Sequence, residues 1–474
     1  MYSLLLLGLV SFVAALVLTP LVRDLFARLG VVDHPDHSRK LHSHPVPRVG
    51  GVAIVSAVLV SYAVLLLSSL NAGDLVASSL PLVWRLLPAA GLVFLTGLLD
   101  DLITLRPWQK LLGQVVASVL TVVAGVQVRS LGGIAIPEWL GFLLTVVWLI
   151  GCANAFNLID GVDGLAAGVG LFATTTTLIA ALLQGNVPLA LATVPLAGAL
   201  LGFLRFNFNP ATIFLGDCGS LTVGFLLGCY GVLWAQKSAT LLGITAPLMA
   251  LAVPLLDTFI AIVRRFLRFR PIFGADRQHI HHRLLALGHS PRQVALLIYG
   301  VCGIAAALSL LLSVATRDSF AGIILILFCA GAWVGVQHLG YVEFGTARRM
   351  LFQSAFRYHL NAQLALSAFQ ESLEAAPTPE QCWETLKSYA GEFGFSEICL
   401  RLAGNHYSDL TNEERPDGWH IQVPLTDEDY LILVRSFESQ AQTPVVAPFV
   451  DSAARILRQK LLSFSGHERL PASV

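Results

Sequence analysis

The sequence predicts an all-α polytopic membrane protein with about eleven transmembrane helices, followed by a small α/β domain at its C-terminal end. Three observations support this prediction. Of the 474 residues, 55% are hydrophobic and only 13% are charged, with a mean hydropathy of +0.71, whereas a soluble domain carries roughly 25% charged residues. Apolar runs of bilayer length recur as far as residue 340. Beyond that point the composition becomes mixed, and no further run is long enough to cross a membrane.

Each predicted span is a run of mostly apolar residues close to the length of about 20 residues that a bilayer core requires. The first run has no basic segment in front of it and is followed by many others. We therefore interpret it as a transmembrane helix and not as a cleaved signal peptide. The expected spans lie near residues 3–22, 49–68, 84–99, 110–128, 139–157, 165–183, 187–204, 219–235, 241–263, 294–314 and 319–340.

Basic residues in the loops predict the orientation, because cytoplasmic loops are enriched in Lys and Arg. The loops after the first, third and ninth spans are basic, whereas the loops after even-numbered spans carry few Lys and Arg. The N-terminus is therefore expected outside and the C-terminus inside. A formal net charge of zero gives no indication of nucleic acid as a partner. The seven scattered cysteines, without a CxxC pair, predict neither a zinc site nor a disulfide framework.

Two domains are expected, a membrane domain over 1–344 and a cytoplasmic domain over 345–474. The second pattern predicts a leading amphipathic helix at 353–375, a further helix, three strands and a closing helix at 446–464. This order is loosely similar to that of a GAF domain. No kinase, cyclase or metal motif occurs in it, so a sensor whose tail does the work is disfavoured. A binding partner for this domain and a homodimer of the chain are both left open.

Two adjacent carboxylates, Asp100 and Asp101, end the third span. Negative charge is unfavourable at a helix C-terminus, so the pair indicates a divalent cation or a proton-transfer role, with a solvated helix end as the alternative. Asp217 stands at the start of the eighth span, where it is either a helix cap or a metal ligand. Hard oxygen ligands of this kind suit Mg²⁺, with Mn²⁺ as a substitute.

Side-chain amides and carboxylates recur where the fifth span ends. Asn154, Asn157 and Asp160 are spaced three residues apart, which places them on one side of a helix end. Asp163 follows between two glycines. Two amides and two carboxylates in ten residues exceed what a turn between helices needs. We interpret them as contacts to a nucleotide or sugar, with an Asx–Gly turn as the alternative.

Positive and imidazole side chains lie in the first and ninth loops. Lys40 is expected to contact a diphosphate as a point charge, although the cytoplasmic bias toward basic residues is an alternative explanation. The ninth loop follows Arg265 and holds His279, His281 and His282. No fourth ligand accompanies these histidines, and nearby arginines would repel a transition metal. Contact with an anionic diphosphate is therefore the favoured interpretation.

All of these clusters fall on loops that are expected to be cytoplasmic. Polar groups at the edges of apolar helices are costly and therefore indicate a functional site. Together the clusters predict a metal-assisted phosphoryl transfer from a soluble nucleotide donor to a lipid acceptor. A lipid transporter is the alternative from another class. It would place polar residues at mid-span within an inverted repeat, and no such repeat is apparent.

Five segments resemble, in order and spacing, the polyprenyl-phosphate N-acetylhexosamine-1-phosphate transferase family. The resemblance covers roughly residues 1–340. It implies a multi-pass enzyme of the bacterial inner membrane that faces the cytoplasm and uses Mg²⁺. Such an enzyme moves a HexNAc-1-phosphate from a UDP-HexNAc to undecaprenyl or another polyprenyl phosphate, releasing UMP, as the first membrane step of cell-envelope glycan synthesis. The segments are RKLHSHPVPRVGG, GLLDD, NAFNLIDGVDGLAAG, NPATIFLGDCGS and DRQHIHHRL.

The histidine segment is similar to that of the N-acetylglucosamine branch, because the phospho-N-acetylmuramoyl-pentapeptide branch has three consecutive histidines there. The peptidoglycan branch is kept as the alternative. We favour direct attack by the lipid phosphate on the donor, and a covalent aspartyl intermediate is left open.

The resemblance also implies roles for individual residues. Asp217 matches the Mg²⁺ ligand, Asp100 the carboxylate that deprotonates the lipid phosphate, and Asp101 its neighbour beside the metal. The positions that match the nucleotide-sugar site are Asn157, Asp160, Asp163 and Phe214. The positions that match the diphosphate side are Lys40, His279, His281 and His282. Thr104 stands where many members carry a third acidic residue, so only the Asp pair is expected to act.

Overall fold

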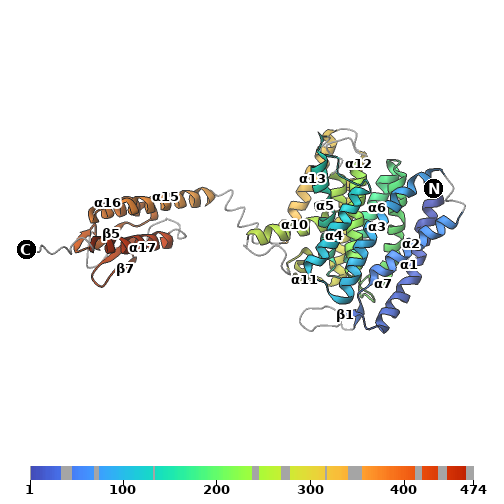
Figure 1. Cartoon of the computed structure of the whole chain (residues 1–474), viewed down its shortest axis with the longest axis horizontal. Coiled ribbons are helices and arrows are strands. Elements are labelled where there is room, and N and C mark those ends of the chain that lie inside the picture. The colour runs from blue at the N-terminus through green and yellow to red at the C-terminus, as the bar shows by residue number, and fades with distance from the viewer. Residues whose placement is uncertain are drawn as a thin grey trace, which may run out of the picture. The chain divides into compact units, whose positions relative to one another are not determined.

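The structure, a computed structural model of the chain, describes residues 2–33, 45–68, 74–131, 134–236, 245–267, 278–314, 318–339, 355–410, 419–435 and 446–465. The chain divides into two units, residues 1–340 and 341–474. Figure 1 shows the first unit as a bundle of long helices and the second as a small sheet with helices. The predicted boundary between residues 344 and 345 lies outside the described residues.

The first unit is mainly helical, because a helix satisfies its backbone hydrogen bonds internally, as a membrane requires. Two short antiparallel hairpins also occur: Val32–Asp33 (β1) with Val46–Pro47 (β2), and Ser130–Leu131 (β3) with Ile134–Ala135 (β4). The helices are α1 (Tyr2–Arg28), α2 (Gly50–Leu67), α3 (Asp74–Ile103), α4 (Pro107–Val123), α5 (Glu138–Ile159), α6 (Leu165–Leu183), α7 (Val187–Asn207), α8 (Gly216–Gln236), α9 (Thr245–Ala250), α10 (Ala252–Leu267), α11 (Ile280–Ala286), α12 (Pro291–Val314) and α13 (Asp318–His338).

Within the described ranges, nine helices are long and apolar enough to cross a membrane: α1, α2, α3, α5, α6, α7, α8, α12 and α13. The prediction of a multi-pass helical membrane protein is therefore confirmed, whereas the number eleven and the orientation stay predictions. The two other predicted spans correspond to α4, which has 17 residues, and to α9 with α10. Pro254 explains the break between α9 and α10, because its ring clashes with the carbonyl of Ala250, four positions earlier.

Helix α8 forms the centre of the first unit. Most of α8 is buried within the unit, whereas α13 is largely exposed. Glycines allow this close packing, which is typical of helices in membranes. A Cβ added to Gly97 of α3 would lie only 2.5 Å from the carbonyl oxygen of Asp217. The start of α8 therefore packs tightly against the end of α3, where the predicted carboxylates lie.

The second unit is a four-stranded antiparallel sheet with helices and a core of its own. Residues Ile398, Leu400 and Leu402 alternate along β5 and pack in this core with Phe369 and Phe449. The strand order is β6-β5-β8-β7. The elements are α15 (Ala355–Ala375), α16 (Pro379–Ala390), a 3₁₀ turn (Gly391–Phe393), β5 (Glu397–Leu402), β6 (Asn405–Ser408), β7 (Trp419–Pro424), β8 (Tyr430–Arg435) and α17 (Val446–Ser465).

The sequence predicts three strands here, and the structure adds a fourth, β6. This strand is short and polar, so its residues give no apolar alternation. A two-residue turn makes it, since Ala403 and Gly404 both have positive φ, at 51° and 79°, as a tight hairpin turn requires. The similarity to a GAF domain stays a prediction.

Candidate active site

The end of α3 and the start of α8 are joined by Asp101. Its Oδ1 accepts a hydrogen bond from the backbone N–H of Asp217 at 2.8 Å, and its Oδ2 accepts one from the N–H of Cys218 at 2.9 Å. The first N–H groups of a helix have no partner within the helix. Asp101 therefore caps α8, which is the role that the sequence offered as an alternative for Asp217.

Two cations bind the remaining carboxylates of this cluster. Lys110 Nζ lies 2.7 Å from Asp100 Oδ2 and 2.6 Å from Asp217 Oδ2. The Arg48 guanidinium lies 2.7 Å from Asp217 Oδ1 and 3.5 Å from Asp101 Oδ1. Asp100 and Asp217 are 6% and 5% exposed, so the cations are needed to offset the cost of burying charge.

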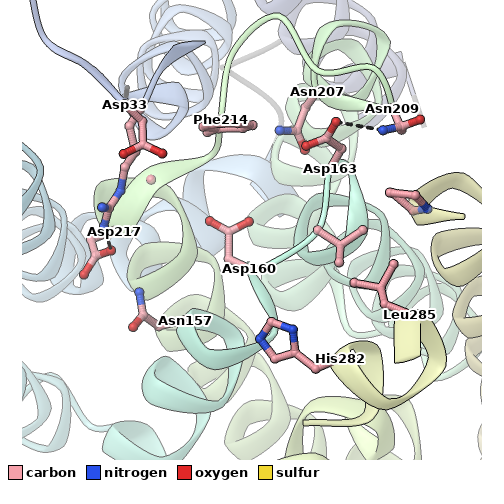
Figure 2. A pocket seen from close by; sticks show the side chains of 15 residues that line it. Asp33, Asn157, Asp160, Asp163, Asn207, Asn209, Phe214, Asp217, His282 and Leu285 are labelled. Carbon is pink, nitrogen blue, oxygen red and sulfur yellow. Dashed lines mark hydrogen bonds and ion pairs between the residues drawn. The ribbon is translucent and has the colours of Figure 1, made fainter. Parts of the chain in front are cut away.

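A cavity of about 460 Å³ opens beside this cluster. Its polar lining comes from helix ends and loops rather than from the middle of any span. Figure 2 shows the carboxylate of Asp160 between Phe214 and His282, with Asn157 and Asp217 on one side and Asp163 on the other. The lining also includes Asp33, Arg48, Asn207 and Asn209.

Asp160 is positioned at the centre of the cavity by the turn that follows α5. Burial raises the pKa of Asp160 well above its usual range, and the nearby charge of Asp217 adds to this effect. A carboxyl group with a raised pKa keeps its proton to a higher pH and, while protonated, can donate a hydrogen bond. Asp160 can therefore present a donor to a ligand, where an ionised carboxylate could only accept.

Asp163 organises the loop that carries Phe214. Its Oδ2 accepts hydrogen bonds from Asn209 Nδ2 at 2.9 Å and from the N–H of Ala211 at 3.0 Å. Phe214 itself is fixed through its backbone, since its N–H donates to the carbonyl of Pro47 at 2.8 Å and its carbonyl accepts from Gly50 at 2.9 Å. The aromatic ring therefore has a defined place in the cavity wall.

The two predicted amides of α5 differ in position. Asn157 lines the cavity and donates to Ser220 Oγ at 3.0 Å. Asn154 is not among the lining residues. Its Nδ2 donates to Gln114 Oε1 of α4 at 2.7 Å and to the Ile150 carbonyl at 2.8 Å. Asn154 thus links two helices beside the site.

The three histidines occupy different surroundings at the start of α11. His282 lines the cavity. His279 is 4% exposed, and its Nδ1 lies 3.2 Å from Asp257 Oδ2. His281 is 1% exposed, and neither ring nitrogen has a hydrogen-bond partner in the described part of the chain. Burial, with a smaller effect from His282, lowers the pKa of His281 to about 3, so this ring is neutral near pH 7.

The remaining predicted positions are Lys40 and Arg265. Lys40 lies outside the described residues. Arg265 is in the last turn of α10, is partly buried, and does not line the cavity.

The cavity and its cation cluster contain residues to which the sequence assigned no role in the site. Lys110 indicated only loop orientation, and Arg48 lay in a family segment without a role of its own. Nothing local showed that they meet Asp217, which lies 107 and 169 positions away. Asp257 stood within an apolar run, where a lone carboxylate is a signal that could have been used. The others are Asp33, Asn207 and Asn209.

A second cavity, of about 320 Å³, lies within the membrane helices and is lined almost entirely by apolar side chains of α2, α3, α7 and α8. One of its lining residues, Gly219, follows Asp217 by two positions. Hydrocarbon is the ligand class that such a lining fits.

The chain is similar in sequence to known proteins. The family model described as glycosyl transferase family 4 matches residues 83–235. A probable undecaprenyl-phosphate N-acetylglucosaminyl 1-phosphate transferase of Bacillus subtilis is 36% identical over 61% of this chain and 79% of its own length. A decaprenyl-phosphate N-acetylglucosaminephosphotransferase of Mycolicibacterium smegmatis is 38% identical over 64% and 80%.

A phospho-N-acetylmuramoyl-pentapeptide-transferase of Desulforamulus reducens is 32% identical over 60% of this chain and 88% of its own length. The resemblance drawn from the five sequence segments is thus confirmed, and the chain belongs to glycosyl transferase family 4.

Proposed function

We propose that this chain transfers N-acetylglucosamine 1-phosphate from UDP-GlcNAc to undecaprenyl phosphate or a related polyprenyl phosphate and releases UMP. The observation that carries the proposal is the meeting of Asp100, Asp101 and Asp217 with Lys110 and Arg48 beside a cavity rich in amides and carboxyl groups. Carboxylates for a metal, cations for phosphates and donors for a nucleotide then occur within one site. The names of the Bacillus and Mycolicibacterium relatives agree with this donor and acceptor.

The carboxylate cluster fits Mg²⁺. Asp101 uses both oxygens to cap α8, so Asp217 is the residue that would hold the ion. A carboxylate offers about four lone-pair sites, and Asp217 uses one on each oxygen for Arg48 and Lys110. Among the described residues no closed group of three or more acidic, His or Cys ligands occurs. Mg²⁺ usually takes one or two carboxylates with substrate phosphate and water. Bound there, the ion would neutralise charge on the diphosphate.

The protein groups have separate tasks in this scheme. Asp160, Asn157 and Phe214 would bind the nucleotide side of the donor, and His282 with Arg48 would contact its phosphates. Asp100 would take the proton of the lipid phosphate, and Lys110 beside it would steady the negative charge. The phosphate oxygen of the lipid then attacks the β-phosphorus of UDP-GlcNAc. A new P–O bond forms, the bond from the β-phosphorus to the bridging oxygen breaks, and UMP leaves with that oxygen.

The acceptor is proposed to lie in the membrane, with its phosphate at the carboxylate cluster. The apolar cavity between α2, α3, α7 and α8 supports a hydrocarbon ligand near that cluster. The site is proposed to face the cytoplasm of a bacterial plasma membrane, because UDP-sugars are cytoplasmic and the loops that form the site include the most basic ones.

A direct assay tests this proposal. Membranes that contain the chain receive radiolabelled UDP-GlcNAc, undecaprenyl phosphate and Mg²⁺, and lipid-extractable label is measured together with released UMP. We expect equal amounts of labelled lipid and UMP. Both should fall by about 100- to 1000-fold in Asp217→Asn, since the carboxylate proposed to hold the metal ion at the diphosphate is lost, and both should vanish when the divalent ion is chelated. Asp24→Asn, in an exposed ion pair with Arg23, is the control.

The Desulforamulus relative makes UDP-N-acetylmuramoyl-pentapeptide a second donor to test. Product from that donor, and none from UDP-GlcNAc, would reassign the sugar and keep the reaction. No product from either donor with folded protein would contradict the proposed function.

A further inference from the structure

A buried carboxylate on α10, Asp257, binds the start of α11. Asp257 is 2% exposed. Its Oδ1 accepts a hydrogen bond from the backbone N–H of Ile280 at 2.9 Å, and its Oδ2 lies 3.2 Å from His279 Nδ1. Burying an ionised carboxylate is costly unless it is paired and hydrogen-bonded. Both contacts of Asp257 therefore go to the segment that carries the histidines.

A second side chain of α10 holds the same segment. Arg264 is 2% exposed and donates through its guanidinium to the carbonyl of Gln278 at 3.1 Å. Asp257 and Arg264 therefore bind three consecutive residues, 278–280, from one helix. Two attachments of this kind fix both the position and the rotation of the short helix α11.

Helix α11 transmits that position to the cavity. A Cβ added to Gly161 would lie 2.5 Å from His281 Nε2, so the His281 ring packs directly against the turn after Asp160. His282, the next residue, lines the cavity and faces the Asp160 side of it in Figure 2. A shift of α11 would therefore move His282 relative to Asp160.

One feature separates Asp257 from a residue that only stabilises the fold. Oδ1 alone makes the contact with the backbone at the start of α11, so the second oxygen is not needed for that contact. The second oxygen and His279 Nδ1 are both buried and face each other, yet they lack hydrogen-bond geometry. In many enzymes such catalytic contacts are poorly aligned without substrate and tighten in the complex. The second oxygen thus has the position needed to orient the His279 ring.

We propose that Asp257 is a positioning residue for the transfer reaction. It holds the ring of His279 through Oδ2 and the start of α11 through Oδ1, and in this way places His282 beside Asp160. The inference rests on the proposed function, because the reaction is what the placement serves. Residues that orient site groups in this way typically contribute about 10- to 100-fold to activity or ligand affinity.

The test is a double-mutant cycle in the full-length chain, with kcat and KM for UDP-GlcNAc measured across pH. Asp257→Asn keeps an acceptor for the Ile280 N–H and removes the charge beside His279. We expect about a 10- to 100-fold loss of kcat/KM, an altered pH profile and an unchanged unfolding temperature. His279→Gln should produce a similar loss. The double variant should be no worse than the poorer single variant, because residues that act as a unit are not additive.

Two further variants complete the design. Thr258→Ala, on the same turn of α10, loses only a hydrogen bond to the Pro254 carbonyl of its own helix, and should stay within about twofold of wild type. Asp257→Glu should recover part of the activity that Asp257→Ala loses. If Asp257→Asn keeps its activity within about threefold, or if the two single losses multiply, Asp257 has no positioning role although the proposed function stands. A wild-type chain that makes no lipid-linked product would overturn both.

Discussion

The two ends of the cavity differ in how their polar groups are satisfied. At the carboxylate end, both oxygens of Asp100, Asp101 and Asp217 have partners within the chain. At the histidine end, both ring nitrogens of His281 and the facing atoms of His279 and Asp257 are buried without hydrogen bonds among the described residues. The carboxylate end is therefore built in advance by the cations of the chain, whereas the histidine end buries polar atoms without a well-aligned hydrogen bond in the described structure.

Removing a cation from the carboxylate end should cause the largest loss of activity. In Lys110→Gln, Asp100 and Asp217 would lose the ammonium group that bridges them at 2.7 and 2.6 Å. We expect roughly a 100-fold loss of kcat, because removing one partner of a buried ion pair leaves charge uncompensated. The rate of lipid-linked product formation measures it.

Lys110→Arg, which keeps the charge, should recover part of that loss, and Arg129→Gln, in a short loop, should behave as wild type. Full activity in Lys110→Gln would mean that Mg²⁺ alone organises the carboxylates.

Disturbing the close contact of α3 with α8 should reduce activity less than removing a charge does, but more than changing an open position on the same helix. An alanine at position 97 would place its Cβ 2.5 Å from the Asp217 carbonyl oxygen, whereas nothing lies within 4 Å of a Cβ at Gly91 on the same helix. Gly97→Ala should lower the free energy of unfolding by about 1–3 kcal/mol and activity by about tenfold. Thermal unfolding in detergent and the transfer assay measure these effects.

Gly91→Ala is the matched control, and it should equal or slightly exceed wild type in stability, because alanine favours a helix more than glycine does. Equal behaviour of the two variants would show that α3 can move away from α8 without cost.

The smallest predicted effect is a pH dependence of the free energy of unfolding that arises from His281 at the histidine end. The pKa of His281 is about 3 in the folded chain and about 6.5 in the unfolded chain. Below pH 6.5 His281 is protonated in the unfolded chain but stays neutral in the folded chain. The free energy of unfolding therefore falls as the pH falls toward 3. At pH 5 the loss amounts to about 2 kcal/mol.

His281→Asn should flatten this pH dependence, as measured by thermal unfolding at about pH 7.5 and pH 5. An unchanged slope in the variant would mean that the His281 ring takes up a proton in the folded chain.

Much of the fold and several site residues could be predicted from the sequence. Apolar run lengths identified the helices, and the cost of polar groups at helix ends identified Asp100, Asp160 and Asp217. Spacing alone could not separate Asn157 from Asn154. Asn157 lines the cavity, whereas Asn154, about one turn earlier on α5, donates a hydrogen bond to Gln114 of α4. A three-residue spacing places both on one side of a helix and does not show where the cavity ends.

The partners of these residues could not be predicted, because they depend on tertiary contacts. Arg48 reaches Asp217 across 169 positions, and Lys110 reaches it across 107. Asp257 meets the start of α11 across 23 positions, again through a tertiary contact. The fourth strand of the second unit was missed for a different reason, since its residues are polar and a turn defines it.

The cap that Asp101 provides has a consequence for how the protein is made. The two carboxylate oxygens of Asp101 accept hydrogen bonds from N–H groups that are synthesised 116 and 117 residues later. Until α8 enters the membrane, the nascent chain holds an unfinished carboxylate pair at the end of α3. The site is therefore completed late in translation, when the central helix is added. A ribosome-bound chain that stops before residue 216 contains two of the three carboxylates and lacks the N–H groups that Asp101 caps.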